Sequence, residues 1–572
     1  MSLILGINAY NHNSSATFVV DGKIAFAAEE ERFDRKKNSD AFPSLALKEG
    51  LKFIGAKASD IDAVGYCWDW RIGVAPRLRA GLLRAWDPLS VYYTTGLDRV
   101  GRLGRIGGIQ SALHDAGVDK ASFRALPHHE CHAATAFLAS PFNEAAVLSV
   151  DGVGEWTTTW MGIGRGTKLS QTGEIRFPHS LGLAYDAVTE FVGFDKRSGA
   201  GKTMGLAAYG DPERFARFFE EWIVLLDGGG FAVRPGPTTW RRYFGYGGVP
   251  LFSRQMTDSL GAPCSKGESW QQHHADAAAG MQRRFEEVIL HLARHLKKST
   301  GAKNLGLAGG CMLNCLANTK LGEESGFDEV FAFPAAHDAG AGSGAALALC
   351  AALDGKRAAW EGAYLGNSVS RAEAVQAFSE AQLDFEEPDD LCGRTAEILT
   401  SGSVVGWVQG RMEFGPRALG NRSLLADPRR HEMKDRLNDK VKHREAFRPF
   451  APACPLESCA DWFEAARATP WMMFTAKVRS EKRSQIAAVN HEDGTARLQT
   501  VTREQNPLFR SLLQAFGEKT GVPVLVNTSL NVAGEPVVAT ARDAVKCFLS
   551  TDMDALVVDG CVALKSRKLR SA

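Results

Sequence analysis

The sequence has almost no net charge and no long apolar stretch, and each absence argues against one class of protein. Lysine and arginine total 67 residues against 66 aspartates and glutamates, so the formal net charge is +1. Sequence-independent binding to DNA or RNA requires a strong basic surplus, so this balance argues against a nucleic-acid partner, although a local basic patch is still compatible with it. No apolar run approaches the roughly 20 residues that span a bilayer, so we expect no membrane insertion.

Closely paired cysteines are also missing, because none of the eleven cysteines forms a C-x-x-C pair. We therefore expect reduced thiols in a cytoplasmic protein. The pairs Cys311/Cys315 and Cys454/Cys459 have the apolar neighbours of packing residues and not the spacing of a metal site. The first eight residues contain no lysine or arginine, which is typical of a buried strand and not of a signal peptide.

The N-terminal part repeats one pattern, a strand followed by a polar loop and a hairpin. The first copy predicts strands at residues 3–8, 17–20 and 24–28, with a hairpin turn at Asp21-Gly22. The second copy begins at Ala145 and returns as a strand at 156–163. A helix at 275–299, with apolar residues at helical spacing, leads to a strand at 304–308 and the turn Gly309-Gly310. This α/β layout is typical of the actin/hexokinase-type ATPase (ASKHA) fold.

A second domain is expected after a change in residue composition near residues 354–372. Strands at 404–408 and 522–526 belong to a new α/β series, so we predict domains at 1–360 and 373–572. The stretches near 69–126 and 225–272 lack clean periodicity and are predicted to be insertions in the first domain. We expect these insertions to contact the ligand for which the protein is specific, because loops carried by a scaffold determine specificity.

Two histidines four residues apart form the first candidate site. His128 and His132 follow Pro127, a favourable first-turn residue, so both rings lie on one face of a helix and can share a metal ion. Taken alone, a histidine pair at this spacing more often consists of surface or capping residues than of metal ligands.

Two aspartates complete the set. Asp151 ends the strand at 147–150, where a carboxylate can hold a cation or simply stabilise a tight turn. Asp338 precedes a Gly-Ala-Gly-Ser-Gly run, where it can bind a metal or cap a helix.

Together, His128, His132, Asp151 and Asp338 resemble the metal site of the tRNA threonylcarbamoyl transferase (TsaD-like) family, which has the same ATPase fold. The loop 308–314 is similar to the adenosine-binding turn of that family. The resemblance implies that the nucleotide is bound by Lys202, Gly309, Gly310 and Asn314.

Further motifs resemble the O-carbamoyltransferases of antibiotic and nodulation-factor biosynthesis, of the NodU/CmcH type and similar to tobramycin carbamoyltransferase. They lie at residues 27–37, 201–210, 415–423, 442–445, 448–452 and 526–531. The resemblance covers the chain from residue 3 to about residue 540. It implies a C-terminal YrdC-like domain, in which carbamoyl phosphate and ATP give carbamoyl adenylate.

Cations for the phosphate and polar groups for the carbamoyl amide are both present in the C-terminal motifs, although any single arginine there also fits a solvated surface charge. The expected carbamoyl phosphate ligands are Arg417, Lys442, Arg444, Arg448, Asn527, Thr528 and Ser529. Which of Arg444 and Arg448 contacts phosphate stays open.

The carbamoyl group is then expected to pass to a hydroxyl of a small-molecule acceptor, with His12 and Asp151 as catalytic residues. His12 lies in the loop after the first strand and suits proton transfer, although a turn histidine with a local hydrogen bond has the same signature. Mixed imidazole and carboxylate ligands fit iron, zinc or manganese. The resemblance implies Fe(II), and it is compatible with Mg²⁺ accompanying ATP and with a homodimer.

Three other functions compete with this interpretation. Threonylcarbamoyl transfer to tRNA is disfavoured by the fused activating domain and the balanced charge. A maturase for hydrogenase cyanide ligands would need zinc-binding cysteine pairs. A non-catalytic nucleotide-binding scaffold of the same fold is disfavoured by the intact metal and phosphate motifs.

Overall fold

The computed structural model describes residues 2–73, 100–239, 250–265, 267–464 and 467–565. These residues form two compact units. Unit 1 contains residues 1–25, 40–44 and 55–360, and unit 2 contains 26–39, 45–54 and 361–572. Two segments near the N-terminus thus pack with the C-terminal unit, although the sequence analysis places all of residues 1–360 in one domain.

The first sheet of unit 1 has five strands in the order β3-β2-β1-β4-β5. Its strands are β1 (Leu3–Asn8), β2 (Ser15–Val20), β3 (Lys23–Glu29), β4 (Ala63–Tyr66) and β5 (Ser122–Ala125). The expected turn at Asp21-Gly22 joins β2 to β3, and both residues have positive φ, as the tight hairpin requires. The chain passes from unit 1 to unit 2 within β3.

The second sheet has the order β12-β11-β6-β7-β8, which is the same arrangement read from its other edge. Its strands are β6 (Glu144–Val150), β7 (Thr157–Arg165), β8 (Lys168–Arg176), β11 (Asn304–Ala308) and β12 (Glu329–Ala332). In both sheets the first strand pairs antiparallel with the hairpin and parallel with a later strand. The α/β class and the repeated strand pattern predicted from the sequence are therefore confirmed.

The two stretches expected to be insertions contain helices and strands. The stretch 69–126 includes β5, which pairs in parallel with β4 and belongs to the first sheet. The strand was missed because it is short and only half-buried, so it shows no apolar pattern. The stretch 225–272 contains most of the hairpin β9 (Ile223–Leu226) and β10 (Gly230–Val233) and the helix α11 (Arg254–Leu260). Residues 74–99 and 240–249 of these stretches lie outside the described residues.

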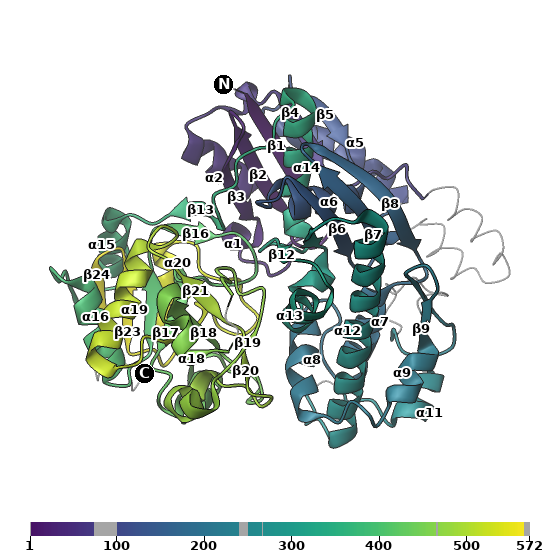
Figure 1. The fold of residues 1–572 in the computed structure, drawn as a ribbon. Helices are drawn as coiled ribbons and strands as arrows, with labels where there is room; N and C mark the ends of the chain where they lie inside the picture. Colours follow the sequence, from purple (N-terminus) through teal and green to yellow (C-terminus); the bar gives the residue numbers. More distant parts are fainter. Residues whose placement is uncertain (1, 74–99, 240–249, 266, 465–466, 566–572) are drawn as a thin grey trace. The chain divides into compact units, whose positions relative to one another are not determined.

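The helices of unit 1 flank its two sheets (Figure 1). They are α5 (Val100–Asp115), α6 (His128–Leu138), α7 (Leu181–Phe191), α8 (Ala200–Leu206), α9 (Ala216–Trp222), α11, α12 (Gln272–Thr300), α13 (Cys315–Glu324) and α14 (Asp338–Asp354). The predicted helix at 275–299 is confirmed as the centre of α12. Among the helices that the structure describes, none combines the length and the apolar character needed to cross a membrane.

Helix α14 packs very closely on α6 and on β1, and glycine makes this possible. A Cβ added to Gly344 would lie 1.8 Å from the carbonyl oxygen of Cys131 in α6. A Cβ added to Gly6 in β1 would lie 2.1 Å from the carbonyl oxygen of Gly342. Real Cβ atoms do not approach so near, so only glycine allows this three-way contact.

Arg357 secures the far end of α6. Its guanidinium donates hydrogen bonds to the carbonyl oxygens of Phe137, Leu138, Ser140 and Phe142. The last carbonyls of a helix have no partner within the helix, so a cation there satisfies them and complements the helix dipole.

Unit 2 is built on an eight-stranded sheet in the order β14-β24-β23-β15-β17-β22-β18-β21. The strands are β14 (Phe385–Glu386), β15 (Val405–Val408), β17 (Arg422–Ala426), β18 (Ala451–Pro455), β21 (Gln499–Val501), β22 (Leu525–Ser529), β23 (Ala555–Val558) and β24 (Cys561–Leu564). Smaller pairs are formed by β13 (Tyr364–Ser368) with β16 (Arg411–Glu413) and by β19 (Ala476–Lys477) with β20 (Thr495–Ala496).

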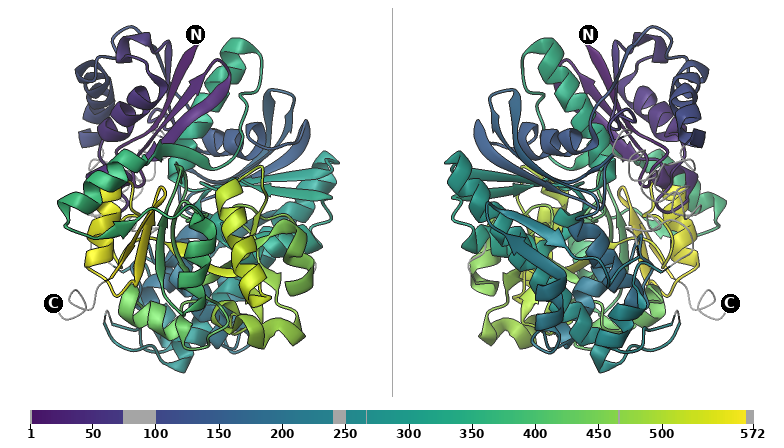
Figure 2. Two further views of the ribbon diagram at one scale, coloured as in Figure 1. Left: turned by 90° about the vertical axis from the view of Figure 1, so that its left-hand side faces the viewer. Right: turned by 90° about the vertical axis from the view of Figure 1, so that its right-hand side faces the viewer.

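Both faces of this sheet are covered, and alternate residues of each strand enter different cores (Figure 2). In β15, Trp407 packs with α16 (Leu391–Thr400) and α19 (Pro507–Thr520), whereas Val408 packs with α15 (Arg371–Glu380) and α20 (Ala541–Leu549). The short helices α1 (Glu31–Asp34), α17 (Met433–Arg436) and α18 (Cys459–Trp462) and the helix α2 (Ser44–Ile54) are also present. The strand predicted at 522–526 begins later, at Leu525, because Pro523 has no N–H for the ladder.

The close packing of α14 yields the first testable prediction. Gly344→Ala should lower the thermal stability, because the added methyl meets the Cys131 carbonyl and overpacking costs about 1–3 kcal/mol. Gly201→Ala in α8 is the matched control, since no atom lies within 4 Å of its added Cβ and alanine favours a helix by roughly 1 kcal/mol. Thermal unfolding measures the stability of both variants, and hydrogen exchange measures the local stability of α6. Equal stability of the two variants would contradict the close contact.

Candidate functional site

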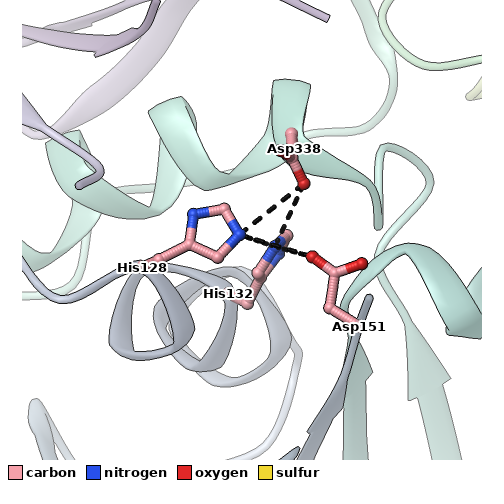
Figure 3. A group of neighbouring side chains, drawn as sticks. All are labelled: His128, His132, Asp151 and Asp338. Atoms are coloured by element: carbon pink, nitrogen blue, oxygen red, sulfur yellow. Dashed lines mark hydrogen bonds and ion pairs between the residues drawn. The ribbon is translucent and has the colours of Figure 1, made fainter. Parts of the chain in front are cut away.

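The two candidate histidines begin α6 and point to the same place (Figure 3). His128 and His132 are both fully buried, and their Nε2 atoms lie 3.1 Å apart. Residues four apart on a helix share one face, as the spacing predicts. Two nitrogen ligands are thus directed at a single point.

Asp151 and Asp338 bring carboxylate oxygens to the same point (Figure 3). Asp151 directly follows β6, and its Oδ2 lies 3.3 Å from Nε2 of His128 and 3.4 Å from Nε2 of His132. Asp338 is the first residue of α14, and its Oδ1 lies 3.6 and 3.7 Å from the same nitrogens. All four ligand atoms lie within 4.8 Å of one another, so the structure brings together the four residues singled out in the sequence.

The charges around this point suit a cation. Burial by itself would lower the pKa of His128, but Asp338 and Asp151 raise it well above the usual value. Burial would likewise raise the pKa of Asp151, but hydrogen bonds from the two histidines lower it well below its usual value. Oδ1 of Asp338 is buried and accepts no hydrogen bond among the described residues. A metal ion would satisfy this oxygen and replace the protons that the site attracts.

A second layer of residues orients these ligands. The Glu155 carboxylate accepts hydrogen bonds from the backbone N–H groups of His128, at 2.9 Å, and of Asp69, at 2.7 Å. Nδ1 of His128 lies 3.2 Å from the Cys67 carbonyl oxygen, so Nδ1–H donates there and Nε2 is left as the ligand. Asn11 donates to Oδ2 of Asp338 at 2.7 Å. Glu155, Asp69, Cys67 and Asn11 were not predicted from the sequence as orienting residues.

His12 lies beside the four-residue group. Its Nε2 is 3.6 Å from Oδ2 of Asp338, and half of its side chain, 51%, is exposed. The negative charge of Asp338 raises the pKa of His12 despite its desolvation. The side chain of Asn8 donates to the carbonyl oxygens of His12 and Asn13 and so fixes the loop that presents this imidazole.

Asp186, in α7, is a carboxylate that the sequence analysis did not identify. Burial and the nearby charge of Asp151 raise its pKa to about 8. The position carries no local signal, because Asp186 lies among apolar helix residues and approaches Asp151 only in the folded chain.

The predicted adenosine loop contacts Asp151, one of the four candidate ligands. The N–H of Gly310 donates to Oδ1 of Asp151 at 3.2 Å. Gly309 has φ of 94°, and a Cβ there would meet the Val150 carbonyl oxygen at 2.2 Å. Asn314 caps α13 by accepting from the Ala317 N–H. It also donates to Gln282 at 2.9 Å, so the protein already engages much of its side chain.

Lys202, the remaining nucleotide candidate, lies on α8. Its ammonium is 5.6 Å from the centre of the Phe194 ring. A role in nucleotide binding stays a prediction for this residue.

Lys442 contacts the end of β22, and Arg444 and Arg448 lie near enough to Lys442 to affect its charge. Nζ of Lys442 donates to the Ser529 carbonyl oxygen and, at 2.8 Å, to Oδ1 of Asn531. Burial and the charges of Arg444, Arg448 and Lys37 lower the pKa of Lys442 well below its usual value. Burial, together with Arg448 and Arg497, lowers the pKa of Arg444 to about 9. Buried cations that repel one another are relieved by an anion between them.

Asn527 offers a buried acceptor in the same strand. Its Nδ2 donates to Gln499 at 2.7 Å, whereas its Oδ1 is buried and accepts no hydrogen bond among the described residues. Thr528, the next residue of β22, pairs with Leu424 of β17 and is half-buried.

Arg417 is carried by a turn that the buried carboxylate of Glu413 organises. Oε1 of Glu413 accepts from the N–H groups of Leu419, Asn421 and Arg422. The side chain of Arg422 is fully buried and donates to carbonyl oxygens, so its role in this motif is structural.

Comparison with known proteins points to one family. The "Carbamoyltransferase N-terminus" profile matches residues 105–347, and the "Carbamoyltransferase C-terminus" profile matches residues 396–565. A protein of Synechocystis sp., sll1178, is 39% identical over 99% of this chain and 97% of its own. Nodulation protein NolNO of Sinorhizobium fredii is 38% identical over 98% of this chain and 80% of its own.

A relative with a stated activity also matches. The 3'-hydroxymethylcephem-O-carbamoyltransferase of Streptomyces clavuligerus is 33% identical over 65% of this chain and 66% of its own. Among solved structures, full-length HypF in its phosphate- and nucleotide-bound form covers 63% of this chain and 56% of that chain, with 14% identity and a TM-score of 0.33. That likeness is too low to support an argument about ligands.

The orienting layer gives the second prediction. Glu155→Gln should weaken metal binding by about 10- to 100-fold, because the neutral amide holds the His128 and Asp69 N–H groups less well and loses a negative charge near the site. Glu144→Gln in β6 is the control, since that carboxylate is exposed and pairs with Arg165 at the surface. Titration of metal-free protein with Zn²⁺ measures the affinity. Unchanged affinity in Glu155→Gln would show that this carboxylate does not support the ligands.

Proposed function

This chain belongs to the carbamoyltransferase family and is a transferase, and from that premise we propose that it moves a carbamoyl group from carbamoyl phosphate, with ATP, to a hydroxyl of a small molecule. The observation that supports the proposal is a pair of residue groups of opposite character, two histidines with two aspartates in unit 1 and a group of cations in unit 2. Membership of the family sets aside the non-catalytic scaffold. We assign unit 1 to the TsaD-like branch of the ATPase fold and unit 2 to the YrdC-like fold.

Activation takes place in unit 2. Carbamoyl phosphate, ATP and one water molecule give carbamoyl adenylate, phosphate and pyrophosphate. Lys442, Arg444 and Arg448, with Arg417, neutralise the phosphate dianion, and Arg adds bidentate contacts. The free Oδ1 of Asn527 accepts from the carbamoyl NH₂, and Thr528 and Ser529 add polar groups at the same strand end.

Transfer takes place in unit 1. His128, His132, Asp151 and Asp338 would hold one divalent metal, for which we propose Fe(II). Such an ion supplies Lewis-acid polarisation of the carbamoyl oxygen. The adenosine part of the adenylate lies at Gly309, Gly310 and Asn314, with Lys202 as a cation for the phosphate.

His12 is the proposed base for the acceptor hydroxyl. Its imidazole is half-exposed and held by Asn8, so it can reach a bound acceptor. Asp338 raises the pKa of His12, and a cation on Asp338 would oppose that effect and favour the neutral form that accepts a proton. Nε2 of His12 takes the hydroxyl proton while AMP leaves, so the products are the carbamate ester, AMP and a proton.

The acceptor is proposed to be a secondary metabolite with an apolar ring. Trp68 precedes one undescribed stretch, and its ring centre lies 5.0 Å from the ring of His128. An indole beside the transfer site offers a flat apolar wall, against which a sugar or other ring can pack.

The division into two sites can be tested by supplying the intermediate. Arg417→Ala and Lys442→Ala should abolish adenylate formation, because the dianion loses its counter-charges, yet both should still carbamoylate the acceptor from preformed carbamoyl adenylate. His128→Ala and Asp338→Ala should form adenylate and fail in transfer. Carbamoylated product is measured with each substrate. Rescue of the metal-site variants by adenylate would show that the two-site scheme is wrong.

The base is tested separately. His12→Asn should keep the bound metal and the adenylate step, and its transfer rate should fall by about 100- to 10,000-fold, the usual contribution of a general base. Metal analysis and single-turnover transfer from adenylate are the measurements. A variant that transfers at the wild-type rate would exclude His12 as the base.

A further inference from the structure

The first motif of the chain belongs physically to the C-terminal unit. Residues 26–39 and 45–54 pack with residues 361–572, although more than 300 residues separate them in sequence. The segment is held together internally, because Glu30 accepts from the N–H groups of Leu45 and Ala46, and Glu31 accepts from that of Asn38. The proposed reaction assigns no role to residues 26–39 and 45–54.

Arg32 forms a hydrogen bond to the turn that contains Arg417. Its side chain is only 4% exposed, and Nη2 donates to the Gly415 carbonyl oxygen at 2.9 Å. Glu29 and Glu31 lie at 3.7 and 4.0 Å from the guanidinium and fix its position. Gly415 has φ of 120°, which only glycine adopts readily, so the turn needs an external contact to hold its direction.

Arg35 donates hydrogen bonds to the loop that follows β22. Its Nη1 donates to the Val537 carbonyl oxygen at 2.7 Å and its Nη2 to the Pro536 carbonyl oxygen at 2.8 Å. This loop begins at Ser529 and includes Asn531, which binds Nζ of Lys442 at 2.8 Å and donates to the Glu535 carbonyl oxygen. The contact made by Arg35 therefore lies at the opposite end of the loop from the contact made by Lys442.

We propose that Arg32 and Arg35 are positioning residues of the carbamoyl phosphate pocket, each holding one of the two loops that present its ligands. The inference rests on the proposed function, because it assumes that Arg417, Lys442 and Ser529 bind this substrate. Neither arginine touches the substrate. A guanidinium can hold a loop in this way because its planar fork donates several hydrogen bonds in fixed directions.

The experiment uses the full-length protein with Arg32→Met, Arg35→Met and the conservative Arg32→Lys and Arg35→Lys. The Met variants should raise the Kd for carbamoyl phosphate and its KM in the adenylate assay by on the order of 10- to 100-fold, since a shift of about 1 Å in a binding group has effects of this size. The KM for ATP and transfer from preformed adenylate should stay within about twofold of wild type. The Lys variants should recover part of the loss, because a cation with fewer donors remains.

Arg542→Met is the matched control, because that arginine lies in the same unit and pairs with Glu380 at the surface. It should leave all these constants unchanged. Calorimetry with carbamoyl phosphate alone reports binding without ATP, and thermal unfolding reports folding. If the Met variants unfold, the Kd and KM for carbamoyl phosphate are measured on the Lys variants instead.

Two results would overturn the inference. If Arg32 and Arg35 variants bind carbamoyl phosphate as the wild type does, or if the KM for ATP rises as much, the arginines only stabilise the fold. The wild-type titration separates this failure from that of the proposed function. If the wild-type protein does not bind carbamoyl phosphate at all, the pocket assignment falls and the positioning role falls with it.

Discussion

The approach of α14 to α6 is the constraint on which the group of His128, His132, Asp151 and Asp338 depends. Asp338 is the first residue of α14, and His128 and His132 lie in the first two turns of α6, so the distances between these residues depend on how near the two helices pass. Gly344 lets the backbones meet where any side chain would strike the Cys131 carbonyl. Ser15 adds a hydrogen bond from its hydroxyl to the Ala339 carbonyl oxygen, which anchors the same helix end to β2. A small-residue run that resembles a simple helix start therefore determines the geometry of a four-ligand cluster.

Burial of like charges is the physical feature that the two sites share, with opposite sign. In unit 1, the carboxylates of Asp151 and Asp338 converge where desolvation is expensive, and they raise the pKa of His128 well above its usual value. In unit 2, Lys442 is buried and Arg444 is half-buried; burial and the charge of Arg444 lower the pKa of Lys442, and burial and the charge of Arg448 lower the pKa of Arg444. Uncompensated buried charge is costly unless it is paired, so each cluster is stabilised by a ligand of the opposite charge. We propose a metal cation for the first cluster and a phosphate dianion for the second.

Local patterns predicted the elements well and the long-range partners poorly. The period of α12, the strand β1 and the spacing of His128 and His132 follow from neighbouring residues, and all three appear in the structure as expected. The membership of residues 26–39 in unit 2 could not be predicted, because it depends on contacts across more than 300 residues, such as that between Arg32 and Gly415. Glu155 was missed for a similar reason, since its partners at Asp69 and His128 are brought to it only by the fold. Strand β5 and the start of β22 were misjudged because pairing, and not composition, defines strand limits.

The link between Gly310 and Asp151 bears on which compound the transfer site recognises. The N–H of Gly310 donates to Oδ1 of Asp151, whose other oxygen faces the two histidines. If Gly309 and Gly310 contact adenosine as we propose, the nucleotide loop and the metal ligand share one hydrogen bond and shift together. A compound that carries adenosine and the carbamoyl group in one molecule would use both parts of this arrangement, whereas carbamoyl phosphate would use only one. If unit 1 acts on carbamoyl adenylate as we propose, this shared hydrogen bond favours the adenylate over carbamoyl phosphate as the compound that unit 1 selects.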